Sequence, residues 1–433
     1  MIIHIVSAGQ SLQSIARQYG VGVERLSFDN SLSPESRLPI GQPLVVVLPE
    51  KTHTVAPGET LLSIARQYRV PVYRLWRQNL FLNGGEALYP GQTLYIEVGR
   101  DPLGSFQIGG YAYPFIPEPL LNRTLPLVGG IMPFTYGFRS DGSLFPLRDE
   151  RLLQRCTVYG STPVMHLSTL TDGDRFSTEL ARTLLQNDSL QQVLLENVLQ
   201  NLREKGYRGL DVDFEFLGAE NAVPYAEFID RCRRRLNVEG YPVMTALAPK
   251  IADDQPGVLY EGHDYALLGA AADALLLMTY EWGYTYGPPM AVSPIGSVER
   301  VLNYAVSRIA PGKLFLGLSN YGYDFSLPYI RGVSRATSLS TAAAFALAAE
   351  TGAEIRYDET VQAPFFEYTD DRKKAHIVWF EDVRSLSARL ELLPRFGLRG
   401  ALYWNLNREN NQNLVLLDQR VIPASFDLFA PEE

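Results

Sequence analysis

The sequence predicts an α/β protein: a (β/α)8 (TIM) barrel preceded by two small modules, each built in the order strand, helix, helix, strand. Three observations lead to this prediction. The first hundred residues contain an internal repeat, residues 101–433 alternate between strand-like and helix-like stretches, and one strand carries three carboxylates on a single face. A chain of 433 residues has room for two or three domains of ordinary size.

Composition is that of a globular protein and excludes several classes of function. The chain carries 39 Lys and Arg against 48 Asp and Glu, and its net charge of −9 argues against nucleic acid as the main partner. No apolar run approaches the ~20 residues that span a membrane, and the N-terminus lacks the regions of a secretory signal. The five histidines show no metal-ligand spacing, so we expect neither metal nor cofactor. Cys156 and Cys232 form no CxxC motif and are predicted to be unpaired.

The internal repeat divides the first hundred residues into two units, predicted as residues 1–49 and 50–99. Residues 4–6 match 53–55, residues 14–19 match 63–68, and residues 41–42 match 91–92. The offset grows from 49 to 50 along this series, so the second unit has one extra residue. In that unit Thr60 is a predicted helix N-cap, and Pro-Gly pairs predict turns on both sides of the helical part. Units of about 45 residues lie near the lower limit for an unaided fold and suit a small binding module.

These units resemble LysM modules, which bind glycans that contain N-acetylglucosamine, such as peptidoglycan and chitin. The resemblance implies a groove between the loop after the first strand and the loop before the last strand. In the second unit, the closer match, the expected contacts are Pro57, Gly58, Leu61, Pro90 and Gly91. In the first unit the loops are residues 8–12 and 38–41, with Ala8 and Gln10 where Pro and an acidic residue are common. The alternative is that these glycines and leucines only shape turns and fill a small core.

Residues 101–433 are predicted to form the barrel. Eight candidate strands are residues 108–115, 127–136, 163–169, 209–216, 243–249, 274–282, 314–321 and 398–406. Helical stretches such as 189–204, 223–236 and 297–309 separate several of them, which is the alternation of a (β/α)8 barrel. Residues 326–396 are too long for one strand-helix unit. They contain a helix-like run and two strand-like runs, so we predict a small α+β insertion there.

One candidate strand carries Asp211, Asp213 and Glu215 at alternate positions. Because side chains alternate along a strand, the three carboxylates share one face and the apolar residues between them share the other. Catalytic groups of such barrels lie at the C-terminal ends of strands, where Glu215 would be outermost. Neighbouring carboxylates raise one another's pKa, so Glu215 can stay protonated and act as a general acid.

Residues 209–215 resemble the DGxDxDxE signature of glycoside hydrolase family 18, the chitinase-like barrels. Three further strands agree: residues 278–281 read Met-Thr-Tyr-Glu, residues 316–322 read Leu-Gly-Leu-Ser-Asn-Tyr-Gly, and Trp404 stands on the last strand. The resemblance covers essentially all of residues 101–433. Arg208 departs from it where the first Asp of the signature is usual, and Glu281 replaces the commoner Asp. We expect Arg208 to mark the main difference from ordinary chitinases.

The resemblance implies a retaining mechanism in which the substrate's own 2-acetamido group attacks the anomeric carbon. Glu215 would protonate the leaving oxygen, Asp213 would hold the acetamido N–H, and Asp211 would tune Asp213. Tyr280 would orient the acetamido carbonyl, and Trp404 would form the floor of the sugar subsite. Further expected contacts in the cleft are Glu281, Tyr321 and Tyr113. Each of these aromatic residues could instead be plain packing, and Asp211 could be a buried structural acid.

The pairing of two such modules with this barrel resembles the spore-cortex-lytic N-acetylglucosaminidases of endospore-forming bacteria. We therefore expect a monomeric N-acetylglucosaminidase that cleaves peptidoglycan glycan strands in the spore or cell envelope. Chitin hydrolysis by the same mechanism is the first alternative, although a content of four tryptophans favours peptidoglycan. A catalytically inactive lectin is the second alternative, and the acid at position 215 argues against it.

Overall fold

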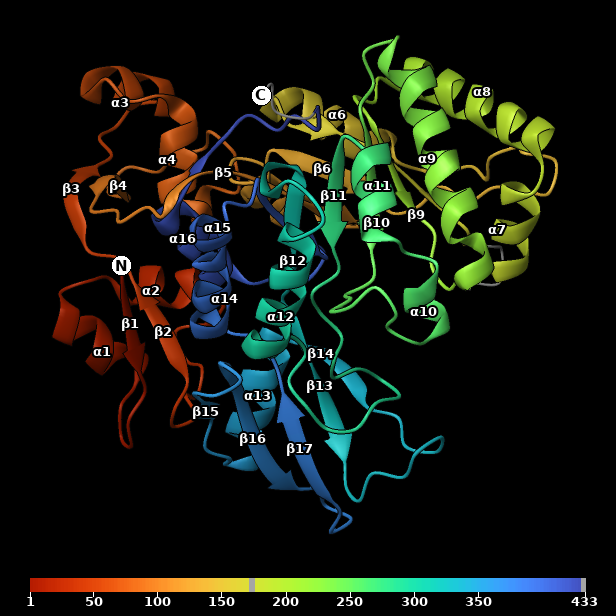
Figure 1. The fold of residues 1–433 in the computed structure, drawn as a ribbon. Coiled ribbons are helices and arrows are strands. Elements are labelled where there is room, and N and C mark those ends of the chain that lie inside the picture. Colours follow the sequence, from red (N-terminus) through yellow and green to blue (C-terminus); the bar gives the residue numbers. More distant parts are fainter. Residues whose placement is uncertain (171–175, 430–433) are drawn as a thin grey trace.

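The computed structural model describes residues 1–170 and 176–429, so the last four residues of the predicted barrel domain lie outside it. Figure 1 shows the two N-terminal modules on one side of a barrel, with a smaller sheet of antiparallel strands below it. Each module contains two antiparallel strands and two helices, in the predicted order. The elements of the first module are β1 (Ile2–Ile5), α1 (Leu12–Tyr19), α2 (Val23–Asp29) and β2 (Pro43–Val46). Those of the second are β3 (Pro49–Thr54), α3 (Leu61–Tyr68), α4 (Val72–Gln78), the 3-10 turn η1 (Leu80–Leu82) and β4 (Thr93–Val98).

Local sequence explains why the two modules fold alike. Ser11 and Thr60 cap α1 and α3, each in a reciprocal capping box with the serine three residues later. A buried asparagine then joins the second helix of each module to its last strand. Asn30 donates to the carbonyls of Leu26 and Val45, and Asn79 bonds the equivalent carbonyls in the second module. The repeat thus preserves side chains that satisfy buried backbone groups.

The barrel contains all eight predicted strands, although most are shorter than predicted. They are β5 (Gly104–Ala112), β6 (Gly130–Pro133), β7 (Thr162–Pro163) with β8 (Met165–Ser168), β9 (Leu210–Asp213), β10 (Val243–Leu247), β11 (Ala274–Leu277), β12 (Leu314–Ser319) and β18 (Gly400–Trp404). Neighbouring strands are parallel and follow chain order, and β7 and β8 together fill one position on either side of Val164. The short strand β19 (Val421–Pro423) pairs with the start of β5.

Helices surround this sheet and bury its outer face. They are α5 (Glu118–Thr124), α6 (Glu150–Tyr159), α7 (Thr178–Leu185), α8 (Asp188–Lys205), α9 (Ala222–Asn237), α10 (Val258–Glu261), α11 (Tyr265–Ala271), α12 (Ile295–Val306), α14 (Val383–Leu390), α15 (Leu392–Phe396) and α16 (Asn411–Arg420), with the 3-10 turns η2 (Ala219–Asn221) and η3 (Pro311–Lys313). Val212 on β9 and Phe214, directly after its end, are fully buried in this outer layer. The opposite face of β9 therefore points into the barrel.

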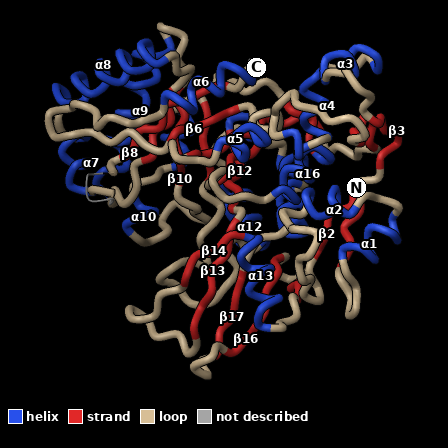
Figure 2. The backbone as a smooth tube through the Cα atoms, turned by 180° about the vertical axis from the view of Figure 1, so that it is seen from behind, coloured by secondary structure: helices blue, strands red, loops and turns tan. Residues whose placement is uncertain are grey.

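The insertion is a five-stranded antiparallel sheet in the order β14-β13-β17-β16-β15. Its elements are β13 (Tyr321–Ser326), β14 (Thr337–Ser340), α13 (Thr341–Thr351), β15 (Arg356–Asp358), β16 (Ala363–Thr369) and β17 (Ala375–Trp379). Figure 2 shows α13 lying over one face of this sheet. The predicted bounds of 326–396 need correction: the sheet begins at Tyr321, directly after β12, and α14 and α15 pack with the barrel helices α16 and α12.

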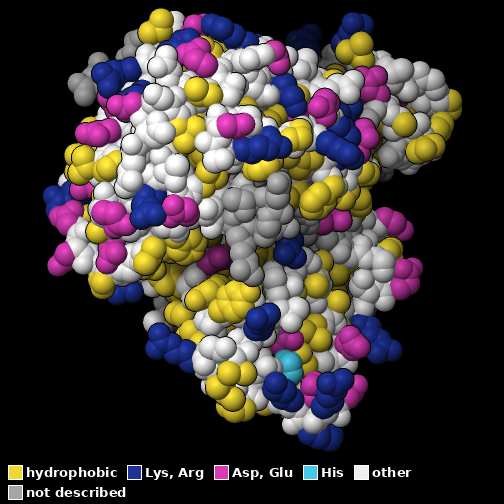
Figure 3. Space-filling view, turned by 90° about the vertical axis from the view of Figure 1, so that its right-hand side faces the viewer, with side chains coloured by type: hydrophobic (Ala, Val, Ile, Leu, Met, Phe, Trp, Pro, Cys, Tyr) yellow, Lys and Arg dark blue, Asp and Glu magenta, His cyan; other side chains and the backbone are white. Residues whose placement is uncertain are grey.

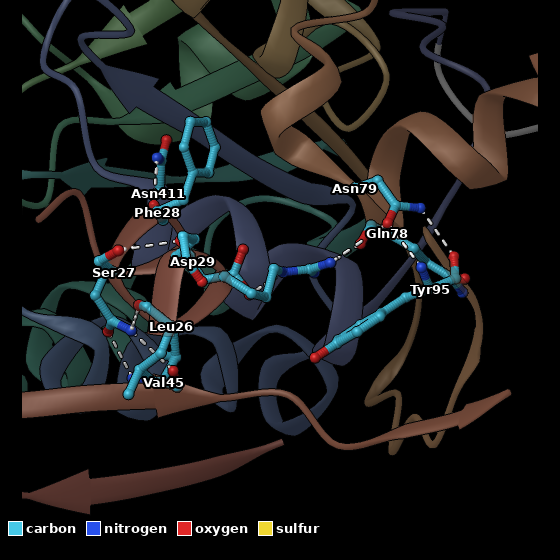
Figure 4. A network of polar contacts seen from close by, with 12 residues as sticks. Leu26, Ser27, Phe28, Asp29, Val45, Gln78, Asn79, Tyr95 and Asn411 are labelled. Carbon is cyan, nitrogen blue, oxygen red and sulfur yellow. Dashed lines mark hydrogen bonds and ion pairs between the residues drawn. The ribbon is translucent and has the colours of Figure 1, made fainter. Parts of the chain in front are cut away.

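Buried polar contacts fix the two modules to each other and to the barrel. Arg25 in α2 donates to the carbonyl of Gln78 at 2.6 Å, and Asn411 in α16 donates to the carbonyl of Phe28 at 2.7 Å (Figure 4). Arg77 in the second module forms an ion pair of 2.9 Å with Asp418 in α16, and both side chains are almost fully buried. Because buried polar groups are costly to leave unpaired, these contacts hold the modules in one orientation.

Candidate active site

The strand β9 places its acids among the side chains of β8. Asp211 pairs in register with His166, and Asp213 pairs with Ser168. Asp211 is fully buried and Asp213 is 7% exposed. The alternation predicted from the sequence is therefore observed, with the carboxylates inside the barrel. On the face shown in Figure 3, hydrophobic side chains gather around a hollow between the barrel and the insertion.

Asp211 is the deepest of the three acids. Its Oδ2 accepts a hydrogen bond of 2.8 Å from the hydroxyl of Tyr111 on β5. Burial raises the pKa of Asp211 to about 7, while the positive charge of His166 lowers it, the charge of Asp213 raises it and the Tyr111 hydrogen bond lowers it. This carboxyl group therefore exchanges its proton near neutral pH.

His166 is a site residue that the sequence analysis missed. Its Nε2 lies 3.5 Å from Oδ2 of Asp213 and 3.9 Å from Oδ2 of Asp211, and its Nδ1 contacts the hydroxyl of Thr135 at 2.6 Å. The ring packs edge-on against Tyr111 and stacks on Phe134. A histidine at an inward position of the neighbouring strand was the available signal, because alternation places its side chain beside Asp211.

Glu215 lies two residues beyond the end of β9 and is half-buried. Burial, then the charges of Asp213 and Glu281, raise its pKa well above the ordinary value. The buried His263 holds this segment, since its Nε2 lies 2.9 Å from the carbonyl of Phe214 and its Nδ1 accepts from the amide of Ala248. The accepting Nδ1 requires the proton to be on Nε2, and burial lowers the pKa of His263, which favours this neutral form.

Tyr280 and Glu281 follow the end of β11 and face the same acids. Burial raises the pKa of Tyr280 well above its ordinary value, and the charges of Asp213, Glu281, Glu215 and Asp211 raise it further, so the phenol stays protonated. Oε1 of Glu281 accepts hydrogen bonds of 3.0 Å from the hydroxyls of both Tyr321 and Tyr323. Tyr321, the first residue of the insertion sheet, thus forms part of the mouth of the barrel.

Aromatic rings form one side of the site. Trp404, at the end of β18, packs against Phe134, Tyr111 and Tyr113 with ring centroids 4.8, 5.7 and 6.1 Å away. Tyr113 also stacks on Phe115, which is 75% exposed. Trp404 and Tyr113 therefore belong to one aromatic cluster with Tyr111, whose hydroxyl bonds Asp211.

The predicted groove residues of the second module lie on its surface with one exception. Pro57, Gly58, Pro90 and Gly91 are exposed. Backbone hydrogen bonds of Val55 with residues 91 and 92 hold the two loops next to each other. Leu61 is the exception: it is the first residue of α3 and its side chain is fully buried in the module core, so it cannot offer a side-chain contact to a glycan.

The interpretation of Arg208 also needs correction. It precedes β9 and its side chain is exposed, while its amide donates to the carbonyl of Pro163 at 2.8 Å. The acids lie toward the carboxyl end of the same strand. The departure from the usual signature is therefore at the amino end of the barrel, away from the acid cluster.

Neither a metal cluster nor a membrane span is visible in the part of the chain that the structure describes. Within residues 1–170 and 176–429, no group of three or more His, Cys, Asp or Glu is placed to hold a metal ion. Over the same ranges, no helix combines the length and the apolar character needed to cross a bilayer. Cys156 and Cys232 are buried and unpaired, as predicted.

Comparisons with known proteins agree with both parts of this architecture. The model of glycosyl hydrolases family 18 matches residues 167–409, and the LysM domain model matches residues 4–47 and 53–97. The cortical fragment-lytic enzyme of Bacillus anthracis is 36% identical over 418 residues, which cover 95% of this chain and 96% of that protein. The one of Bacillus subtilis (strain 168) is 40% identical over 289 residues, and the matched part is 66% of this chain and 66% of that protein.

A solved structure extends the likeness over nearly the whole fold. The spore cortex-lytic enzyme SleL of Bacillus megaterium QM B1551 has a TM-score of 0.82 at 33% sequence identity. The superposition covers 98% of this chain and 99% of that one. With its barrel and two LysM domains, the chain belongs to glycosyl hydrolases family 18.

Proposed function

We propose that this glycoside hydrolase is a retaining β-N-acetylglucosaminidase that cleaves peptidoglycan glycan strands of the spore cortex. The observation that carries the proposal is the position of Glu215 at the mouth of the barrel, next to Asp213 and with a pKa raised by burial and by neighbouring carboxylates. A carboxyl group in this state keeps its proton to a higher pH than an ordinary glutamate does, which is what a general acid requires. A lectin, which binds glycans without cleaving them, does not require a general acid.

Catalysis would proceed through the acetamido group of the bound sugar. Glu215 donates its proton to the glycosidic oxygen while the acetamido oxygen attacks the anomeric carbon, so the bond to the leaving sugar breaks and a cyclic oxazolinium ion forms. Glu215, now ionised, takes a proton from water, and the hydroxide opens the ring to give the product with retained configuration. No covalent bond to the protein forms at any stage.

The remaining side chains stabilise the charge that develops. Asp213 would accept a hydrogen bond from the acetamido N–H and balance the positive charge of the oxazolinium ion. Tyr280 would donate a hydrogen bond from its hydroxyl to the acetamido oxygen. Asp211, with its pKa of about 7, would set the charge state of Asp213 by sharing a proton. Trp404 would stack on the apolar face of the sugar.

The names of the relatives support the choice of substrate. Proteins named cortical fragment-lytic enzyme match this chain over most of its length, and we infer the same polymer and a site of action in the spore envelope. The LysM domains would hold the enzyme on N-acetylglucosamine-containing strands. We further propose the division into modules 1–49 and 50–99 and a catalytic domain 101–433, acting as a monomer without a cofactor.

A glutamine at position 215 tests the mechanism. We expect Glu215→Gln to reduce hydrolysis of cortex fragments about 10²- to 10⁴-fold without loss of binding to insoluble wall. Glu220→Gln, at an exposed acid on the nearby turn η2, is the matched control and should keep full activity. Full activity of Glu215→Gln would overturn the mechanism. Mass spectrometry of products from cortex and from chitin decides the substrate, and preferential release of chitin fragments would favour a chitinase.

A further inference from the structure

The grooves of the two LysM domains have different surroundings. In the second domain Gly58 and Gly91 are exposed, and a Cβ added to either would meet nothing within 4 Å. In the first domain Gly41, the equivalent of Gly91, is buried, and a Cβ there would lie 1.8 Å from the carbonyl oxygen of Ile355. The amide of Ile355 also donates to the carbonyl of Ile40 at 2.9 Å. One groove is open, and the other adjoins the insertion.

The loops of the first groove nevertheless keep the geometry of the second. In the second domain Nε2 of His53 and the amide of Ala56 both contact Oε2 of Glu59 at 2.7 Å. In the first domain Nε2 of His4 and the amide of Ser7 both contact Oε1 of Gln10 at 2.9 Å. The amide oxygen of Gln10 therefore replaces the carboxylate of Glu59 in shaping the loop. The unusual residue thus preserves the two contacts that shape this loop.

A cavity of about 680 Å³ lies between the first groove and the insertion. Ser7, Ala8 and Ile40 line it from the LysM domain, and Arg356, Tyr357 and Phe365 line it from strands β15 and β16. Figure 1 shows β15 on the side of the insertion that is nearest to β2. The volume falls within the range of small-ligand sites. The lining combines apolar side chains with several charged ones, among them Glu354, Asp358 and Arg384.

The insertion side of this cavity is already ordered. The ring of Phe365 stacks on Trp379 with centroids 4.6 Å apart, and the guanidinium of Arg356 lies 4.6 Å from the Phe365 centroid. Arg356 is paired with Glu367. The other nearby cation, Arg384, is paired with Asp382 at 2.7 Å. Because both positive charges are matched by carboxylates, this wall suits an uncharged polar ligand better than an anion.

We propose that the first LysM domain and the insertion together form a second glycan-binding cleft, which takes an uncharged N-acetylglucosamine-containing segment of the polymer. This proposal rests on the proposed function. The second domain binds glycans by itself, whereas the first binds them fully only when β15 and β16 supply the opposite wall. Since α16 fixes the first domain to the barrel, a strand in this cleft is held at a constant position relative to the active site.

Methyl NMR of the full chain tests the cleft site by site. The probe is the chitin tetrasaccharide, and a Glu215→Gln background prevents its hydrolysis. The Ile40 methyl group reports on the cleft and that of Leu62, 48% exposed in α3, reports on the second domain. We expect both signals to titrate. Phe365→Ala should raise the dissociation constant read from Ile40 at least about fivefold and leave the Leu62 titration unchanged.

A matched pair of glycines supplies the second variant. Gly41 and Gly91 have nearly equal positive φ values of 84° and 87°, so alanine strains both backbones alike, but only Gly41→Ala also collides with Ile355. We expect Gly41→Ala to weaken the Ile40 titration and Gly91→Ala to leave it unchanged. An Ile40 titration that is absent from the parent protein, or unaffected by Phe365→Ala and Gly41→Ala, overturns the proposal. Hydrolysis of soluble cortex fragments by the same variants with Glu215 restored shows that they are folded. An absence of this hydrolysis in the wild-type protein would refute the proposed function instead.

Discussion

Replacing Asp211 with asparagine should stabilise the fold at neutral and alkaline pH while it impairs catalysis. Asp211 is fully buried and its pKa rises from 3.8 to about 7 on folding. Between these values the folded protein holds a proton that the unfolded chain has released. Stability therefore falls as pH rises through this window, by about 1.4 kcal/mol per pH unit and by about 4 kcal/mol in all. Asparagine is neutral at every pH and can still accept the Tyr111 hydrogen bond.

Urea unfolding of both proteins between pH 4 and pH 8 measures this effect. The variant should match the wild type near pH 4, gain stability steadily up to pH 7 and keep an advantage of at most about 4 kcal/mol above it. The figure is an upper limit because Asp213 and His166 readjust when one charge is removed. Asp188→Asn, at an acid whose side chain is 81% exposed, is the control and should show no such slope. A difference between wild type and Asp211→Asn that does not change with pH would refute the reasoning.

Three other substitutions test separate parts of the structure. Tyr280→Phe removes the proposed donor to the acetamido oxygen and should lower kcat about 10- to 100-fold with little change in KM. His166→Gln removes the charge that lowers the pKa of Asp211, so the pH profile of kcat should move to higher pH. Asn79→Ala leaves three backbone groups of the second LysM domain unpaired and should lower its unfolding free energy by about 2–3 kcal/mol in urea titrations.

The barrel was predictable because its strands are short apolar runs separated by amphipathic helices. The insertion was harder to delimit. Strand β12 ends at Ser319 and β13 begins at Tyr321, so no turn signal separates the barrel from the inserted sheet. The helices α14 and α15 were assigned to the insertion because an amphipathic pattern does not reveal which neighbour buries it. Their places in the fold depend on tertiary packing.

The acids of the site were predictable because they lie along one strand, where alternation alone decides their direction. His166 and Tyr323 were not recognised because they reach the acids from other strands. Their positions depend on strand register, which residue spacing within one segment does not contain. Leu61 shows the opposite error: a residue in a loop-helix motif was taken as a ligand contact, although it lies on the apolar stripe of α3.

The location of Arg208 indicates that another residue must account for any difference in the charge of the acids. Because Arg208 is exposed at the amino end of β9, it has no means of altering the charge of the acids at the other end. His166 has such means, since its imidazole lies within 4 Å of both Asp211 and Asp213. Burying carboxylates without a cation opposes folding, and a histidine beside Asp211 and Asp213 offsets part of that cost. The chemistry of the acid pair therefore depends on a residue of the neighbouring strand as much as on the signature itself.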